Sequence, residues 1–302
     1  MSLWIIATLA AATFQTIRFM LQKTLASGAL SAGGATFSRF LYSAPLVVVI
    51  VALAMMATGT ALPPLPLSFW AYGAVGGAAQ ITATVFVVML FKSRNFAVGI
   101  TFKKTEVIQT VIVGLVVLGD GVSLWALVFI VIGVVGLLIL SDPPEGASGS
   151  LWQRVANRAA ALGLASGVLF AISAVSYRGA SLALELDQPM LRAGLTLAAV
   201  TSMQLIAMVI WLRWREPGEI SRVWAVRRTA VFVGLTSMAG SYGWFLAFTL
   251  QNAAYVKALG QVELILSLLA SVLFFREKVT GRELLGMAVL AVSILGLIFV
   301  LH

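Results

Sequence analysis

The sequence contains no cysteine, and its single histidine, His302, is the last of 302 residues. The lack of cysteine excludes disulfide bonds, thiolate metal sites and cysteine nucleophiles, and no histidine lies inside the chain to serve a catalytic or metal centre. Charge is scarce as well: charged residues make up 10% of the chain and apolar residues 61%. A soluble domain carries about 25% charged and roughly 45–50% apolar residues. These shortages together predict an all-α integral membrane protein with many membrane-spanning helices.

The basic excess of the chain does not indicate a nucleic-acid-binding protein. The net charge is +9, but Lys and Arg are spread over loops and helices, whereas nucleic-acid binding requires them to be clustered on a soluble surface. Within the apolar segments no two carboxylates occur at the spacing of metal ligands. We therefore expect no enzyme, no cofactor, no bound metal and no nucleic acid. The expected partners are the lipid bilayer and a small-molecule substrate.

Ten apolar segments are long enough to cross a membrane, which takes about 20 helical residues. They lie at residues 3–21, 34–58, 68–91, 97–118, 122–140, 159–180, 189–212, 229–250, 253–275 and 280–301. A polar, turn-rich linker, residues 141–158, separates the first five from the last five. The sequence thus predicts a multi-pass protein of the cytoplasmic (inner) membrane, with a first repeat over residues 1–140 and a second over residues 159–302.

The acidic residues support such a repeat. Glu106 and Glu263 are the acidic residues that lie well inside apolar segments, and they are 157 residues apart. Asp120 and Glu277, which close the same two segments, are also 157 residues apart. Two equal spacings of so rare a residue class indicate one five-helix unit present twice. Because five is odd, the second copy enters the membrane in the opposite orientation.

The loop charges agree with inverted repeats. Thirteen of the 20 Lys and Arg residues lie in loops that follow odd-numbered segments, and only Arg178 lies near a loop that follows an even-numbered one. By the positive-inside rule the basic loops are cytoplasmic. This bias predicts that the linker, residues 141–158, lies in the cytoplasm and that both termini lie outside.

Three short motifs carry a resemblance to a known family: Ser38-Arg39-Phe40 in the second segment, Leu118-Gly119-Asp120 at the end of the fourth and Phe275-Arg276-Glu277 at the end of the ninth. With the five-plus-five plan, the whole chain resembles the drug/metabolite transporter superfamily, specifically ten-helix proteins made of two EamA-type units. The resemblance implies two inverted five-helix repeats around a central cavity, which opens alternately to each side without ATP, in a monomer or homodimer. It also implies cytoplasmic termini, in disagreement with the charge bias.

Candidate substrate-binding residues are the polar, charged and aromatic side chains inside the apolar segments. At about 1.5 Å per residue, Glu106 and Glu263 lie roughly 14–15 Å from the starts of their segments, near the middle of a membrane core about 30 Å thick. The full set is Arg18, Arg39, Gln80, Lys103, Lys104, Glu106, Arg192, Trp244, Lys257, Gln261 and Glu263.

Several of these residues also have a purely structural interpretation. Arg18, Arg39, Arg192 and Lys257 all lie within about two turns of a segment end, so each can extend to the lipid headgroups. Lys103 and Glu106 form an i, i+3 pair that can be a structural ion pair. Asp120 and Glu277 are each expected to cap the segment that follows.

The charge balance of the segment interiors predicts the kind of substrate. Six basic residues against two acidic ones leave +4 inside the apolar segments, which favours a small organic anion or zwitterion such as an amino acid, organic acid or phosphorylated metabolite. Glu263 has no basic residue at i±3 or i±4 and is the better candidate for carrying a proton in proton-coupled transport or exchange. A lipid flippase or scramblase, and an exporter of cationic drugs, remain alternatives.

Overall fold

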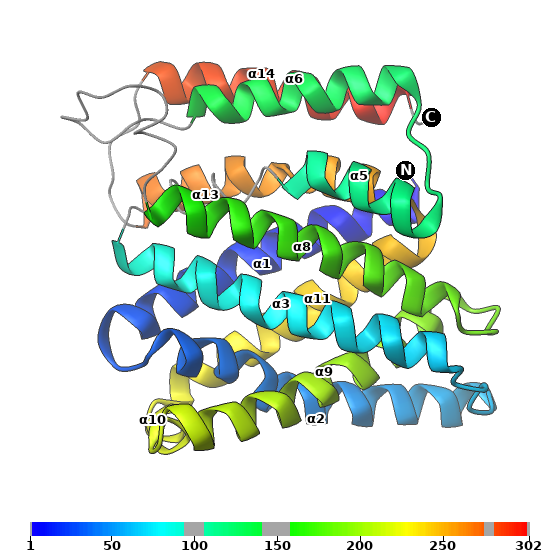
Figure 1. Ribbon diagram of the computed structural model, residues 1–302, viewed down its shortest axis with the longest axis vertical. Coiled ribbons are helices and arrows are strands. Elements are labelled where there is room, and N and C mark those ends of the chain that lie inside the picture. The colour runs from blue at the N-terminus through cyan, green and yellow to red at the C-terminus, as the bar shows by residue number, and fades with distance from the viewer. Residues whose placement is uncertain (1, 94–105, 141–157, 275–280, 301–302) are drawn as a thin grey trace.

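The computed structural model describes residues 2–93, 106–140, 158–274 and 281–300, and within these residues all regular structure is helical. The helices lie side by side in a bundle (Figure 1). They are α1 (Leu3–Gly28), α2 (Ala32–Thr58), α3 (Leu67–Ser93), α5 (Glu106–Leu118), α6 (Leu124–Leu140), α8 (Arg158–Leu182), α9 (Pro189–Arg215), α10 (Glu219–Ala225), α11 (Arg227–Leu250), α12 (Ala253–Leu259), α13 (Val262–Leu273) and α14 (Gly281–Val300).

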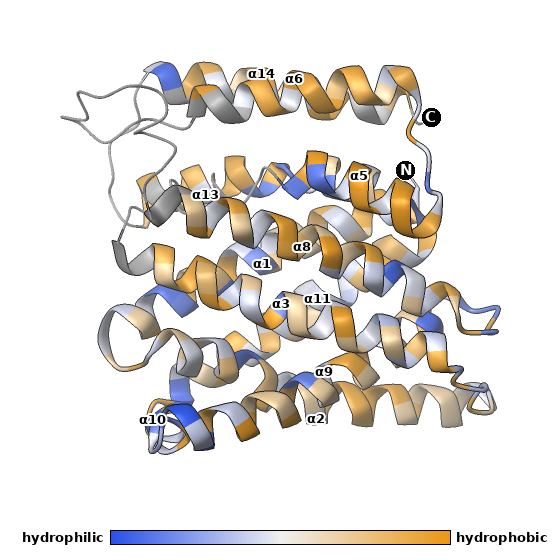
Figure 2. Cartoon of the chain, viewed as in Figure 1, coloured by the Kyte–Doolittle hydropathy of each residue, from blue (hydrophilic) through white to orange (hydrophobic). Residues whose placement is uncertain are grey.

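The expected all-α membrane protein is confirmed. Within the described residues, seven spans are long and apolar enough to cross a membrane: those in α1, α2, α3, α8, α9 and α11, and the stretch over residues 253–270 that α12 and α13 share. Apolar stretches of α5, α6 and α14 are shorter, at 10–17 residues. Figure 2 shows apolar residues along the lengths of the helices, with hydrophilic residues concentrated around α10 and at a few places inside the bundle.

Local sequence accounts for where several helices begin and end. The Ser31 hydroxyl accepts a hydrogen bond from the Gly34 amide and so caps α2, and the Asn252 side chain caps α12 in the same way. Gly59 ends α2 with φ at 63°, in the left-handed region that favours glycine. Pro189 starts α9, where its fixed φ suits the first turn and no amide hydrogen is needed.

The two halves of the chain are interleaved in the bundle. The closest packing is of α1 on α11, α3 on α8, α2 on α9 and α6 on α14, so that each of these pairs joins a helix from before the linker to one from after it. α6 and α14 form one edge of the bundle in Figure 1, and α2 and α9 lie at the opposite edge. Residues from the two halves therefore face each other throughout the interior.

An ion pair ties the halves together at one end of the bundle. The Arg178 guanidinium donates to the Asp120 carboxylate at 2.7 Å and to the main-chain carbonyls of Phe248 and Gln251, both at 2.9 Å. The sequence predicted that Asp120 caps α6, and this prediction is wrong, because the carboxylate pairs with Arg178 instead. Ser123 performs that role by accepting a hydrogen bond from the α6 backbone at 3.2 Å. We call the contacts of Arg178 the end brace.

Candidate functional site

A buried glutamine, Gln15 of α1, is the centre of the first polar cluster. Its side-chain amide donates to Glu263 Oε2 at 2.9 Å, while its carbonyl oxygen accepts from Trp244 Nε1 at 3.0 Å and from Arg18 Nη2 at 3.4 Å. Glu263 is 0% exposed and Arg18 is 2% exposed. A single amide thus joins α1, α11 and α13, and it places a guanidinium and a carboxylate on its two sides.

A break between α12 and α13 determines the position of Glu263. α12 ends at Leu259 and α13 begins at Val262, so the carboxylate lies in the first turn of the second helix. Gly260 at this break lies against the indole ring of Trp244, and a Cβ atom there would be 2.5 Å from Trp244 Cη2. Only glycine allows the indole to approach so closely. Gly260 and Gln261 keep right-handed helical dihedral angles, and the Glu263 and Leu264 amides donate to the Gly260 and Gln261 carbonyls, so the break is a tightened turn between two helical segments.

A second charged pair crosses between the halves of the chain. Lys257 Nζ of α12 is 3.5 Å from Glu106 Oε2 of α5. The same ammonium group lies 4.9 Å from the centre of the Trp244 ring, 5.6 Å from that of Phe248 and 5.7 Å from that of Phe170. Aromatic rings at such distances attract a cation through their faces. Lys257 is thus held by a carboxylate and three rings, and it is 7% exposed.

Arg39 of α2 lies among hydroxyl groups. Its Nε donates to Ser237 at 2.8 Å, Nη2 donates to Ser241 at 2.9 Å and Nη1 donates to Thr84 at 3.4 Å. The side chain is 3% exposed, and no described carboxylate forms an ion pair with it. Arg18 lies close enough to interact electrostatically with Arg39 as well as with Glu263. The interior therefore holds two neighbouring guanidinium groups.

A cluster of amides and a phenol lies next to Arg39. Tyr177 of α8 donates to Gln80 Oε1 of α3 at 3.0 Å, and Gln204 Nε2 of α9 lies 3.0 Å from the same oxygen and 3.2 Å from the Tyr177 hydroxyl. The Tyr177 ring stacks on Phe245 with 4.3 Å between centroids. Thr84, which accepts from Arg39, donates to the main-chain carbonyl of Gln80 at 2.8 Å and so joins this cluster to the guanidinium. This cluster links α3, α8 and α9 behind the guanidinium.

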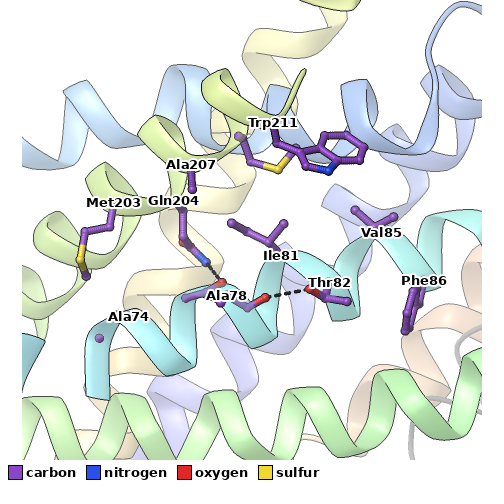
Figure 3. A pocket seen from close by; sticks show the side chains of 13 residues that line it. Ala74, Ala78, Ile81, Thr82, Val85, Phe86, Met203, Gln204, Ala207 and Trp211 are labelled. Carbon is purple, nitrogen blue, oxygen red and sulfur yellow. Dashed lines mark hydrogen bonds between the residues drawn. The ribbon is translucent and has the colours of Figure 1, made fainter. Parts of the chain in front are cut away.

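A cavity of about 550 Å³ lies between α3 and α9. Small residues of α3, including Gly73 and Gly77, form one wall, and Met203 and Trp211 of α9 line the other (Figure 3). Gln204 is one of its few polar residues, and in Figure 3 its amide donates to the backbone of α3. The cavity is thus mainly apolar, and it meets the polar interior at Gln204.

The structure brings most of the predicted site residues together, but several in places that the sequence did not indicate. Arg18, Arg39 and Lys257 are buried among protein groups and do not extend to the headgroups. Arg192 instead donates through Nε and Nη2 to the Leu186 carbonyl in the loop before α9. Gln261 faces α6, since a Cβ atom on Gly133 would be 3.6 Å from its Nε2.

The predicted lysine pair cannot be compared with the structure. Lys103 and Lys104 lie outside the described residues, and with them the predicted ion pair between Lys103 and Glu106. The predicted cap residue Glu277 also lies outside the residues that the structure describes. Among the described residues the basic partner of Glu106 is Lys257. Within the same described part of the chain, no three His, Cys, Asp or Glu side chains are grouped so that they could hold a metal ion.

Sequence reasoning missed the neutral residues that organise the site. Gln15 shares a helix face with Arg18, but an amide in an apolar helix gave less signal than the charges around it. Ser237 and Ser241 are four residues apart and so lie on one face of α11, a spacing that could have pointed to a common partner. Tyr177 and Gln204 carried no such pattern.

Comparison with known proteins supports the transporter fold. Residues 157–299 match the model of the EamA-like transporter family. A solved crystal structure shares the fold with a TM-score of 0.67 at 16% sequence identity, over 96% of this chain and 98% of the other. No curated protein matches the sequence. Over residues 157–299 the chain is thus similar to the EamA-like transporter family, which supports membership of the drug/metabolite transporter superfamily.

Proposed function

We propose that the protein is a secondary active transporter that moves a small organic anion or zwitterion across the cytoplasmic membrane by alternating access. The observation that carries this proposal is the buried set of charges contributed by both halves: Arg18 and Glu106 from the first, Lys257 and Glu263 from the second. A charge in the middle of a membrane costs at least about 2.5 kcal/mol even on the most lenient scales, and is retained for function by default.

The pairing of helices supports two inverted repeats with ten spans, residues 1–140 and 159–302. If α1 corresponds to α8 and α3 to α11, exchanging the two halves converts the α1–α11 pair into the α8–α3 pair, and both pairs are present. The same exchange maps the α2–α9 and α6–α14 pairs onto themselves. In Figure 1, α1 and α8 also run in opposite directions. A pseudo-twofold arrangement of this kind places a substrate site between the repeats.

The charge balance supports an anionic or zwitterionic substrate. Among the described interior residues, Arg18, Arg39 and Lys257 oppose Glu106 and Glu263, which leaves one positive charge when all are ionised. A carboxylate or phosphate on the substrate would neutralise this charge, whereas a permanent cation would increase it. An ammonium group on a zwitterion could be held by Glu106 and the ring of Trp244.

Proton coupling would depend on Glu263, which lies at the break between α12 and α13. Its carboxylate is fully buried and is hydrogen-bonded by Gln15, an uncharged donor. Protonation of Glu263 would remove a negative charge beside Arg18 and leave that guanidinium available to an anion. We therefore propose that a proton and an anionic substrate bind together and are carried in the same direction, or that substrate exchange occurs without net proton movement.

A binding screen followed by transport tests this function. The purified protein is screened by thermal shift against amino acids, organic acids, sugar phosphates and nucleotides, and each stabilising compound is then tested for counterflow into proteoliposomes. We expect at least one anion or zwitterion to be exchanged at a rate that empty liposomes do not reach. Stabilisation by permanent cations alone would contradict the proposal and support an exporter of cationic drugs.

The cavity between α3 and α9 favours a lipid flippase or scramblase as the second candidate function. Its mainly apolar walls could take an acyl chain, and Gln204 stands where the cavity meets the polar interior. Transfer of fluorescent phospholipids between leaflets, measured by dithionite quenching, separates this function from the first. Rapid lipid transfer without counterflow of any soluble compound would support the flippase or scramblase and contradict the metabolite transporter.

A further inference from the structure

Arg39 carries a buried positive charge that its described neighbours do not neutralise. Its three hydrogen bonds go to the hydroxyl groups of Ser237, Ser241 and Thr84, and it forms no ion pair with a described carboxylate. Hydroxyl groups orient a guanidinium but leave its charge in place. A buried charge is costly unless an opposite charge accompanies it. Among the described residues, the surroundings of Arg39 therefore lack a carboxylate that pairs with it.

Arg18 has the same deficiency on the neighbouring helix. Its Nη2 donates to Gln15, but its Nη1 is fully buried and has no hydrogen-bond partner among the described residues. Arg18 also lies within electrostatic reach of both Arg39 and Glu263, so among the described residues one carboxylate faces two guanidinium groups. The pair is thus short of one negative charge and of at least one hydrogen-bond acceptor.

The hydroxyl groups around Arg39 still have hydrogens to donate. Thr84 uses its hydrogen on the Gln80 carbonyl at 2.8 Å. Ser237 and Ser241 accept from Arg39, and within the described part of the chain neither donates to another group. A hydroxyl that accepts a hydrogen bond from a guanidinium can still donate its own hydrogen to a ligand that the guanidinium binds. Two serines one turn apart on α11 therefore add two donors beside the two arginines.

We propose that Arg18 and Arg39 form a subsite for an oxyanion, which binds to both guanidinium groups and to the hydroxyls of Ser237 and Ser241. Every unused group at this place is a donor, and a carboxylate or phosphate is the ligand that accepts from all of them. The inference rests on the proposed transport function and specifies it. The anionic end of the substrate is bound by α1, α2 and α11, apart from the Lys257–Glu106 pair.

Direct binding of simple anions tests the subsite. The probes are inorganic phosphate and acetate, each titrated against the purified protein at constant ionic strength with chloride as the balancing ion. We expect saturable stabilisation in a thermal-shift assay by at least one probe, and the stronger probe identifies the substrate's charged group as phosphate or carboxylate. Equal stabilisation by chloride would overturn the proposal.

Two variants test whether the anion binds at this subsite. Arg39→Met removes the charge while retaining an apolar side chain of similar length, and it should abolish saturable anion binding without lowering the melting temperature of the anion-free protein. Replacing a buried charge by an apolar residue of similar size is often neutral or stabilising. The double variant Ser237→Ala, Ser241→Ala retains Arg39 and should weaken binding by at least about tenfold, through the loss of two charge-assisted hydrogen bonds.

The matched control is Ser43→Ala. Ser43 is a buried serine on α2, one turn from Arg39, and its hydroxyl donates to the main-chain carbonyl of Arg39 and not to the guanidinium. Anion binding should be unchanged in this variant. Unchanged binding in both Arg39→Met and the double serine variant would overturn the subsite even if the protein transports a metabolite. Anion binding that depends on Arg39, in a protein that exchanges no compound, would overturn the transport function and leave the subsite standing.

Discussion

The Lys257–Glu106 pair should behave as a coupled unit in stability measurements. The charged atoms are 3.5 Å apart and both side chains are buried. At an effective dielectric constant of about 20, two unit charges at that distance attract by about 5 kcal/mol. Removal of either charge leaves the other buried and without this partner, which typically costs about 3–5 kcal/mol. Lys257→Met is the suitable change, because methionine keeps the contact with the three aromatic rings.

The double variant distinguishes the pair from two independent residues. Glu106→Gln alone should also destabilise by about 3 kcal/mol, whereas Lys257→Met combined with Glu106→Gln should cost roughly 1 kcal/mol or less, because no charge is then left buried. The measurement is reversible unfolding in mixed micelles, followed by the fluorescence of the eight tryptophans. Arg222→Met is the control: its ion pair with Glu219 spans 3.3 Å, the Arg222 side chain is 70% exposed, and the buried Glu219 keeps the hydrogen bond from the Ser31 amide, so the loss should be about 0–1 kcal/mol.

Additive effects would refute the reasoning about this pair. If the double variant were destabilised by the sum of the two single effects within about 0.5 kcal/mol, Lys257 and Glu106 would not stabilise each other. Each would then act through its other contacts, which for Lys257 include the three rings.

Three further predictions follow from the topology, from Glu263 and from Gly260. Reporter fusions should find His302 outside and the linker, residues 141–158, in the cytoplasm, and the reverse pattern would show that the family's usual orientation prevails over the loop charges. Glu263→Gln should abolish pH-driven uptake into liposomes but leave substrate exchange intact, and equal loss of both activities would count against the proton role. Gly260→Ala should cost about 1–3 kcal/mol through overpacking against the indole ring, whereas Gly28→Ala, with no atom within 4 Å of the added Cβ, should change stability by less than about 0.5 kcal/mol.

The helices could be predicted from the sequence because the length of each apolar run gives the approximate length of the helix that it forms. Each of the ten expected segments overlaps helix in the described residues, but the ninth is divided into α12 and α13, and several ends differ by a few residues, as between 34–58 and Ala32–Thr58. The break at Gly260 could not be predicted, since glycine is common in membrane helices and only the nearby indole ring explains it. α10 was also missed, because seven residues between two long helices show too little periodicity.

The contacts inside the site depend on tertiary packing, which sequence spacing does not report. Spacing along one helix led to Lys103 as the partner of Glu106, while Lys257 is 151 positions away and reaches Glu106 because α12 packs on α5. The distance of Arg18 from the end of its helix predicted that its side chain can reach the lipid headgroups. This distance says how far the side chain extends but not in which direction it points, and in the structure Arg18 points into the bundle beside Gln15.

The end brace has a consequence for how the protein can move between states. One planar guanidinium, that of Arg178, serves the carboxylate after α5 and the last carbonyls of α11 together. Nε and Nη2 hold the carboxylate while Nη1 holds the two carbonyls, so the ends of α5 and α11 can separate only if the guanidinium releases one side or the other. In the proposed transport cycle, separation at this end would therefore leave Arg178 with either α5 or α11.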